Sequence, residues 1–355
     1  MLKNVPVHRE IPFKPNDCSP PERIVTSSIC LFSLLLTLMV VTFSPLPADA
    51  APAALKKASL IPLWSPQAQF AGYYVALNKG IYRKHGIDLT ILPGGPEQSP
   101  SRLLKSGKAD FAVLWLGTAL QQYSAGVRLT NLAQIVQKSS LMLVARKSGG
   151  IASPADMRGR KVGLWGGDFA VPFQAFLKKY RLQVREIPQS YTVNLFLRGG
   201  IDVTSAMWYN EYHTIINSGI NHEELNLFFL HEHGINFPED GLYALEENCR
   251  KDPALADAFV KASLEGWRYA FDHSDEALEI VLGYMKEASI PANRSHQKWM
   301  LEKMRELILP ENAAEVMGQL KPSDYQSVSA ELLASGVVGS VPGFESFIRR
   351  SNVRQ

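Results

Sequence analysis

The sequence contains little cysteine and almost no excess charge of either sign. Its 355 residues include three cysteines, and Lys+Arg (37) and Asp+Glu (34) leave a net charge of +3. Three cysteines cannot form a disulfide framework. So small a surplus supplies no basic stripe, and we therefore expect no nucleic-acid partner. The length fits two domains rather than one small module.

Motifs of the common enzyme classes are also missing. The chain has no nucleophile elbow, no phosphate loop and no zinc-spaced His/Cys set. His231-Glu232-His233 is the best metal candidate, but it offers no clear third ligand. Cys249 has no basic neighbour, which favours a buried, inert thiol. We therefore expect no catalytic residue, no metal and no cofactor.

The first 50 residues have the pattern of an export signal. Residues 24–43 form an uncharged apolar run, and Ala48 and Ala50 then make an A-x-A cleavage site. We expect cleavage near Ala50 and export to the periplasm. The run is also long enough to span a bilayer, so a retained membrane anchor is the alternative. Cleavage would remove Cys18 and Cys30, and a single remaining thiol suits an exported protein without disulfides.

The remaining chain alternates short aliphatic runs with helical stretches, which predicts an α/β fold of two lobes, each a mostly parallel sheet flanked by helices. We assign residues 58–147 and 242–350 to lobe 1 and residues 148–241 to lobe 2. The hinge is expected near Ala145–Ser148 and Pro238–Leu242. The predicted strands are Ala58–Leu63, Asp88–Leu92, Ala109–Leu114, Leu129–Val136, Leu141–Ala145, Lys161–Leu164, Val184–Ile187, Val203–Met207, Leu227–Leu230 and Leu242–Leu245.

Four of the six tryptophans directly follow predicted strands, two in each lobe: Trp64, Trp115, Trp165 and Trp208. Ligands of open parallel sheets bind beyond the carboxyl ends of the strands. These indoles could therefore stack on a flat ring in a cleft between the lobes. For a single Trp, plain core packing is the simpler interpretation, and only the repeated position in both lobes favours a ligand.

Polar residues occupy the same strand ends. Glu211 follows Trp208 and suits an amino group or a protonated ring nitrogen, although a charge at a helix N-terminus explains it equally well. The loop at Gly167 and Asp168 opens a helix, whose free N–H groups could hold an anion or a carbonyl. The complete candidate ligand-binding set is Trp64, Gln69, Tyr73, Trp115, Gly117, Trp165, Gly167, Asp168, Trp208, Asn210, Glu211 and Asp240.

Several segments resemble the NMT1/THI5-like solute-binding proteins across about residues 58–350. They are Gln69–Ala76, Lys79–Tyr82, Gly86–Leu89, Ser153–Gly163, Tyr209–Tyr212 and Gly234–Tyr243. The resemblance implies a type II periplasmic-binding fold, service to an ABC transporter permease and hinge closure on a small-molecule solute. We expect the protein to act as a monomer. In the family's pyrimidine binders, stacking aromatics and a glutamate reading the amino-pyrimidine are expected, and Glu211 matches that position.

The resemblance leaves the solute open. Thiamine pyrimidine precursors are the first choice, and riboflavin and alkyl sulfonates are the alternatives. A sulfonate site needs cations, and Arg198 is the nearest candidate. Fungal relatives are pyrimidine-forming enzymes that consume their own histidine and carry a cysteine cluster. This chain has Phe70 at the corresponding position before Ala71-Gly72 and no cysteine cluster, which argues against that activity.

Overall fold

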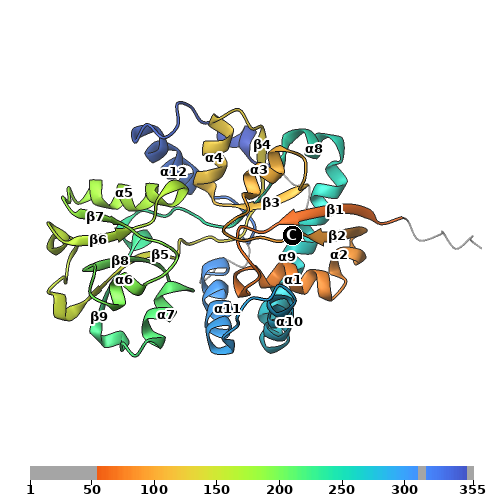
Figure 1. Cartoon of the computed structure of the whole chain (residues 1–355). Coiled ribbons are helices and arrows are strands. Elements are labelled where there is room, and N and C mark those ends of the chain that lie inside the picture. Colours follow the sequence, from red (N-terminus) through yellow and green to blue (C-terminus); the bar gives the residue numbers. More distant parts are fainter. Residues whose placement is uncertain (1–53, 311–316, 350–355) are drawn as a thin grey trace, which may run out of the picture. The chain divides into compact units, whose positions relative to one another are not determined.

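Two five-stranded sheets carry the helices of this computed structural model, which describes residues 54–310 and 317–349 (Figure 1). The first sheet has the order β2-β1-β3-β10-β4, and only β10 runs antiparallel to its neighbours. Its strands are β1 (Lys56–Ile61), β2 (Ile87–Ile91), β3 (Phe111–Leu114), β4 (Leu129–Gln134) and β10 (Gly241–Leu245). The described residues all belong to one compact unit.

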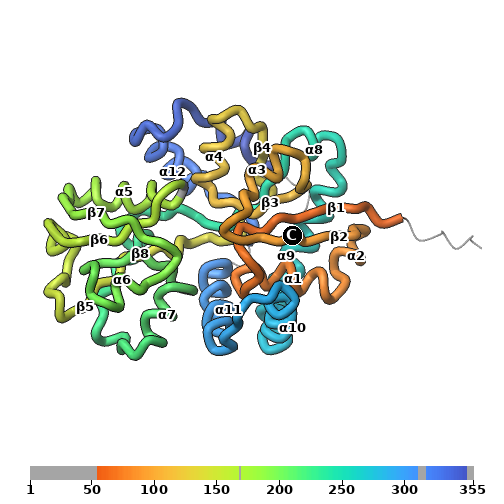
Figure 2. Tube along the Cα trace, in the orientation of Figure 1, coloured from red at the N-terminus to blue at the C-terminus, as the bar shows by residue number. Residues whose placement is uncertain are grey.

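The second sheet repeats this plan with the order β7-β6-β8-β5-β9, and here only β5 is antiparallel. Its strands are β5 (Leu141–Arg146), β6 (Lys161–Leu164), β7 (Arg185–Pro188), β8 (Val203–Met207) and β9 (Leu225–Phe229). Each sheet therefore has one antiparallel strand among four parallel ones, which confirms the mostly parallel sheets expected from the alternating pattern. Figure 2 shows the chain passing between the two sheets.

Helices cover both sheets. Those between and after the first-sheet strands are α1 (Ala71–Asn78), α2 (Ile81–Lys84), α3 (Pro100–Lys105), α4 (Leu116–Ser124), α8 (Glu246–Lys251), α9 (Pro253–Asp272), α10 (Ser274–Glu287), α11 (Arg294–Ile308), α12 (Pro322–Ala334) and α13 (Phe344–Phe347). The helices that follow second-sheet strands are α5 (Ala170–Lys179), α6 (Asn194–Leu197) and α7 (Glu211–Asn217). Short 3-10 turns complete the path: η1 (Ala68–Phe70), η2 (Lys147–Gly149), η3 (Pro154–Met157), η4 (Gly167–Phe169), η5 (His222–Glu224) and η6 (Leu230–His233).

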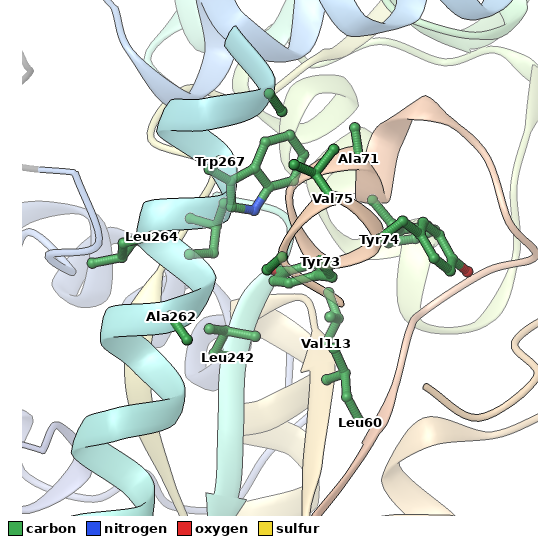
Figure 3. Close-up of a cluster of buried hydrophobic side chains, with 14 of the residues drawn as sticks. Leu60, Ala71, Tyr73, Tyr74, Val75, Val113, Leu242, Ala262, Leu264 and Trp267 are labelled. Atoms are coloured by element: carbon green, nitrogen blue, oxygen red, sulfur yellow. The ribbon is translucent and has the colours of Figure 1, made fainter. Parts of the chain in front are cut away.

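The core of the first sheet depends on a close approach of α1 to α9. A Cβ on Gly72 would lie 2.3 Å from the Trp267 ring, and one on Gly266 would lie 2.3 Å from the Gly72 carbonyl oxygen. Only glycine fits such contacts. Tyr73 packs edge-on against Trp267, among the aliphatic side chains of β1, β3 and β10 (Figure 3). This packing fixes α1, and with it the loop between β1 and α1.

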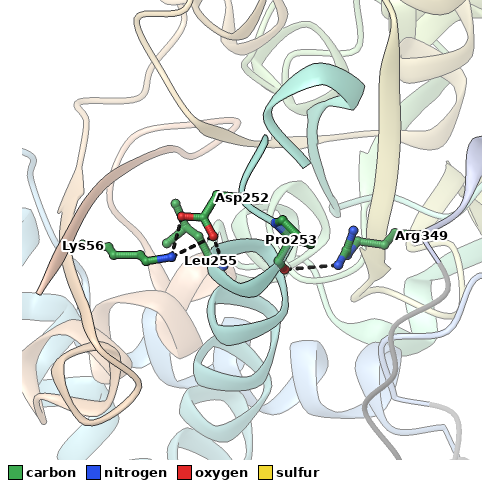
Figure 4. A network of polar contacts seen from close by, with 5 residues as sticks. All are labelled: Lys56, Asp252, Pro253, Leu255 and Arg349. Carbon is green, nitrogen blue, oxygen red and sulfur yellow. Dashed lines mark hydrogen bonds and ion pairs between the residues drawn. The ribbon is translucent and has the colours of Figure 1, made fainter. Parts of the chain in front are cut away.

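Polar contacts tie the C-terminal segment to the start of α9 (Figure 4). Asp252 caps α9 by accepting from the Leu255 N–H (3.0 Å), and Pro253 occupies the first turn. Lys56 of β1 pairs with the same carboxylate. Arg349 donates to the Pro253 carbonyl (3.1 Å) and pairs with Asp257 (2.9 Å). The helices after β10 are thereby held on the first sheet.

The sheets are joined by two crossings, residues 135–140 and 234–240. The first crossing leads into β5, which pairs with β8 and β9 of the second sheet. A division of the chain by sheet membership therefore falls before Leu141, ahead of the expected boundary at residues 147/148 and of the expected hinge at Ala145–Ser148. The second expected hinge segment, Pro238–Leu242, lies where the chain returns into β10. Sequence alone did not show which sheet the aliphatic run of β5 joins.

The proposed signal segment, including residues 24–43, Cys18 and Cys30, lies outside the described residues. Among the helices of residues 54–310 and 317–349, none combines the length and the hydropathy needed to span a bilayer.

Candidate functional site

A cavity of about 110 Å³ lies between the two sheets. The residues around it follow β1 on one side and β6, β7 and β8 on the other, always at the carboxyl ends of parallel strands, as the rule for open α/β sheets requires. They are Leu63, Trp64, Gln67, Gln69, Trp165, Phe169, Tyr191, Met207, Tyr209, Asn210 and Glu211. Both sheets therefore contribute to a single cavity.

Five of the eleven lining residues are aromatic. Trp64, from the first sheet, meets Tyr191, from the second, edge to face with ring centroids 4.9 Å apart. Tyr191 is 61% exposed and so lies at the rim. Phe169 lies edge-on to Trp165 at 6.4 Å and to Trp115 at 4.4 Å. The cavity thus offers flat apolar surfaces from both sheets.

Among the described side chains, Glu211 is the only Asp, Glu, Lys or Arg in the lining. Its Oε2 accepts from the Met207 N–H (3.0 Å), and its Oε1 accepts from the Asn210 amide (2.8 Å). Burial raises the pKa of the Glu211 carboxyl to about 7, against the lowering effect of these hydrogen bonds. At neutral pH this carboxyl can therefore either accept or donate a proton. Within residues 54–310 and 317–349, no Lys or Arg lines the cavity.

A chain of hydrogen bonds orients two glutamines in the wall. Asp240 Oδ2 accepts from Gln69 Nε2 (2.8 Å), and Gln69 Oε1 accepts from Gln67 Nε2 (2.6 Å). Asp240 is buried and has a φ of 40°, a left-handed conformation that Asp tolerates better than most residues. Asp240 does not itself line the cavity, so the structure makes it the support of Gln69.

Buried carboxyls also lie next to the cavity in the second crossing. Burial and the neighbouring Asp240 raise the pKa of Glu239 to about 8, and burial raises the pKa of Asp240 to about 7. Tyr209, fully buried in the cavity wall, has its pKa raised by burial and by the charges of Asp240, Glu239 and Glu211. With pKa values raised in this way, the carboxyls are partly or largely protonated at neutral pH and supply no positive charge for an anion.

The structure brings together five of the twelve residues expected from the sequence. Trp64, Gln69, Trp165, Asn210 and Glu211 all line the cavity. Asp240 supports Gln69 from behind, as described above. This grouping also separates the four strand-end tryptophans into two that line the cavity and two that do not.

The other expected residues lie elsewhere. Trp115 is buried against Phe169, and Tyr73 is buried against Trp267. Trp208 lies under the Lys303 ammonium, 4.4 Å from its ring centroid. Gly117, in the first turn of α4, and Gly167, with a φ of 63°, are not in the lining. The side chain of Asp168 is outside the described part of the structure.

Sequence reasoning missed Leu63, Phe169, Tyr191, Met207 and Tyr209, and Gln67 was noticed without being selected. A signal for Tyr191 existed, because it follows β7 just as the tryptophans follow their strands. Phe169 likewise lies in the segment that follows β6, so aromatic residues after every strand, and not tryptophan alone, are the signal for these two.

The residues weighed for other chemistry have separate roles here. Both histidines belong to the 3-10 turn η6, where His231 lies against the Ser139 carbonyl (2.9 Å) and His233 contacts Tyr180 (2.5 Å). Cys249 is buried as expected, and burial raises the pKa of its thiol to about 11. Phe70 is fully buried in the first-sheet core, and Arg198 is exposed.

Comparison with known structures identifies the fold. The described architecture is that of the type II periplasmic binding proteins. A putative periplasmic sulfonate-binding protein from Methylobacillus flagellatus matches with a TM-score of 0.63 and 16% identity, over 83% of this chain and 92% of its own. At that identity the match shows the fold alone.

The family follows from the sequence. The model of the "NMT1/THI5 like" family matches residues 67–277, and the chain belongs to this family. A riboflavin-binding protein from Chloroflexus aurantiacus is 26% identical over 69% of this chain and 71% of its own. A formylaminopyrimidine-binding protein from Halalkalibacterium halodurans is 23% identical over 74% and 81%. A relative from Legionella pneumophila named 4-amino-5-hydroxymethyl-2-methylpyrimidine phosphate synthase is 24% identical over 63% and 72%.

Proposed function

We propose that this protein is a solute-binding protein that captures a flat, amino-bearing heteroaromatic compound, such as a pyrimidine precursor of thiamine, without transforming it. The observation that carries the proposal is the cavity itself, in which aromatic rings from both sheets surround the buried carboxyl of Glu211. A planar ring would stack between Trp64 and the Trp165–Phe169 side. The Glu211 carboxyl would then bind the ring's amino group.

The chemistry of Glu211 supports an amino-substituted ring. A carboxylate accepts from an exocyclic N–H, and a carboxyl with a pKa near 7 can share its proton with an adjacent ring nitrogen. Its contacts with Met207 and Asn210 hold it in one orientation. The described lining residues include no Lys or Arg, so they do not offer the cation that a sulfonate needs. The relatives that bind a pyrimidine and riboflavin are consistent with a flat ring.

Binding without catalysis is supported by the residues at the positions considered for chemistry. Phe70 presents a hydrocarbon ring to the core where the pyrimidine-forming relatives are expected to have a histidine. The Cys249 thiol is buried, and its raised pKa disfavours the reactive thiolate. Because some relatives are named as synthases, the second candidate function is a pyrimidine-forming enzyme. Incubation with pyridoxal phosphate and iron would test it, and formation of a pyrimidine product would favour the enzyme over the binding protein.

Binding of the solute would favour a closed state in which the two sheets approach each other around it. A ligand shifts a conformational equilibrium only through contacts that one state makes and the other lacks. Trp64 follows a strand of the first sheet, and Glu211 follows a strand of the second. A ring that stacks on Trp64 and hydrogen bonds to Glu211 therefore stabilises the closed state. We further propose that the closed monomer docks to an ABC permease after export to the periplasm. A secreted product beginning near Ala51 would support export, whereas a chain retaining residues 24–43 in the membrane fraction would favour the anchor.

Calorimetric titration of the protein tests the solute class. The compounds are 4-amino-5-hydroxymethyl-2-methylpyrimidine, riboflavin and an alkanesulfonate. We expect a pyrimidine Kd well below millimolar, and roughly ten- to hundredfold weaker binding in both Glu211→Gln and Trp64→Ala. Glu232→Gln, an exposed carboxyl away from the cavity, is the matched control. Binding of the sulfonate alone, or of no flat ring, would refute the proposal.

A further inference from the structure

Two histidines on helices from different sheets face each other outside the cavity. His213 belongs to α7, which follows β8, and His296 lies in the first turn of α11. Their Nδ1 atoms are 3.0 Å apart, with ring centroids 4.9 Å apart and planes at 74°. The His213 ring also stacks on Trp299 of α11, at 5.0 Å. Within residues 54–310 and 317–349, they are the only two imidazoles in hydrogen-bonding contact with each other.

The hydrogen bond on the far side of His296 orients its ring. Nε2 of His296 lies 3.0 Å from Asn210 Oδ1, which can only accept, so Nε2 carries the proton of the neutral imidazole. The lone pair on Nδ1 therefore faces His213. Histidines that bind a metal usually donate their other ring N–H to an oxygen in this way, which fixes the tautomer and the orientation of the ring.

Both imidazoles are available to a cation at neutral pH. Burial lowers the pKa of His213, and burial together with His213 lowers the pKa of His296 to about 4. Neither ring must therefore lose a bound proton before it binds a metal, a requirement that weakens metal binding to protonated histidines. His213 needs only to carry its proton on Nε2 for both Nδ1 lone pairs to face the space between the rings.

The separation of the two nitrogens is close to that of two ligands of one ion. Zn–N bonds of about 2.0–2.1 Å at a tetrahedral angle place the nitrogens about 3.3 Å apart. From 3.0 Å, the rings need only a small shift to reach this distance. Asn217 Nδ2 lies 2.9 Å from His213 Nδ1, and turning this amide over would bring its oxygen there as a third ligand. Water would complete the coordination shell.

We propose that His213 and His296 form a binding site for a divalent transition-metal ion of the Zn²⁺, Cu²⁺ or Ni²⁺ type, which bridges α7 and α11. Imidazole suits these ions, whereas Mg²⁺ and Ca²⁺ prefer oxygen ligands. Because the two ligands come from helices of different sheets, the ion would hold these helices together. Asn210 also donates to Glu211 in the cavity wall, so a bound ion would restrain the position of that carboxyl.

Calorimetric titration of the protein with ZnCl₂, without any solute, tests the site. We expect zinc binding that MgCl₂ does not reproduce, and binding weaker by about tenfold or more in both His213→Gln and His296→Gln. His222→Gln is the matched control, because it removes an imidazole that contacts Tyr212 within the second-sheet half. Absence of zinc binding would overturn the proposal, and so would binding that only one of the two variants weakens, or neither.

Electron paramagnetic resonance with copper provides a second measurement that requires no variant to fold. One equivalent of Cu²⁺ bound to the unaltered protein should show two coordinated imidazole nitrogens. A spectrum with a single imidazole nitrogen would overturn the bridge between the helices. Neither measurement uses a solute. Failure of the metal site would therefore leave the proposed function standing, and failure of pyrimidine binding would leave the metal site standing.

Discussion

Two contacts between the halves of this protein differ in kind. In the crossings, the Glu239 carboxyl accepts from Ser139 Oγ (2.9 Å) and from the Ser140 N–H (2.9 Å). Between α7 and α11, His213 Nδ1 meets His296 Nδ1 (3.0 Å). The first contact joins segments that the chain already connects. The second joins helices from different sheets without a covalent link, so it can open while the crossings remain intact.

The histidine contact is also connected to the cavity. His296 Nε2 hydrogen bonds to Asn210 Oδ1 (3.0 Å), and the Asn210 amide donates to Glu211. Since Asn210 Oδ1 can only accept, Nε2 of His296 carries the proton of the neutral imidazole. Trp299 extends the contact by donating to the Trp208 carbonyl (3.1 Å). The crossings should therefore govern folding, and the histidine contact should govern closure.

The largest expected effect follows from removing the crossing carboxyl. Glu239→Ala would leave Ser139 Oγ and both donors of Ser140 without their acceptor in a buried environment. We expect a loss of about 3–5 kcal/mol in the free energy of unfolding, measured by urea denaturation. Glu239→Gln retains one acceptor oxygen and should cost about 1 kcal/mol. Equal losses in the two variants would show that packing, rather than hydrogen bonding, maintains the crossings.

Changing pH should act on the two contacts in opposite directions. The Glu239 pKa is raised from 4.5 to about 8, so the folded state favours its protonated form, and the stability this gives is lost as pH rises from about 4.5 to 8. The pKa of His296 is lowered from 6.5 to about 4, so its contribution is lost as pH falls from about 6.5 to 4. His213 shifts in the same direction.

The pKa values of Asp240 and Glu211 are also raised, so these carboxyls lose stability over the same range, and the free energy of unfolding should decline from about pH 4.5 towards pH 8. Urea denaturation across pH 4–8 measures the curve. Glu239→Gln should make this decline shallower, and His296→Leu should make it steeper below about pH 6.5. A curve whose shape neither variant alters would mean that other groups control the pH dependence.

Breaking the histidine contact should open the protein without unfolding it. His296→Leu removes the bonds to His213 and Asn210, at a cost of about 1–2 kcal/mol, which is enough to shift an open–closed equilibrium about tenfold. Small-angle X-ray scattering of the ligand-free protein should show a larger radius of gyration. His222→Leu, which breaks a His–Tyr contact within the second-sheet half, is the control. An unchanged radius in His296→Leu would refute a role in closure.

Local sequence signals predicted the strands well because they depend on neighbouring residues. The aliphatic runs at Lys161–Leu164 and Val203–Met207 are strands with those bounds. Which sheet a strand joins depends on residues far away in the sequence. The residues Leu141–Ala145 alone therefore do not indicate that this strand pairs with β8 and β9. The histidine contact was invisible for the same reason, because His213 and His296 belong to helices far apart in sequence.

The tryptophan pattern predicted where the backbone of each tryptophan lies but not where its ring points. Trp64 and Trp115 both follow strands of the first sheet, yet Trp64 lines the cavity and Trp115 is 4% exposed. A strand end fixes where the backbone lies, whereas the rotamer and the local packing decide where the ring points. Glu211 lines the cavity and also begins α7, so its proposed role in binding and its place as a helix N-terminal charge are compatible.

The smallest expected effect concerns Lys303, which tests whether a cation beside the histidine contact adds to the stability of the closed state. Its ammonium lies 4.4 Å from the Trp208 ring centroid and 4.6 Å from that of Trp299, so one cation lies over aromatic rings from both halves. Lys303→Met keeps the stem and removes the charge, at a cost of about 0.5–1 kcal/mol. We expect a two- to fivefold shift towards the open state.

Lys298→Met, an exposed lysine on the same helix, is the matched control for charge. High salt provides a second criterion, because screening weakens exposed charges more than a cation between two rings. The side chain of Lys303 is 16% exposed, so its effect on scattering should persist in 0.5 M salt. If salt alone reproduced the Lys303→Met shift in the unaltered protein, the lysine would act through long-range surface electrostatics and not through its contact with the two rings. The contact between α7 and α11 would then rest on His213, His296 and Trp299 without help from the lysine.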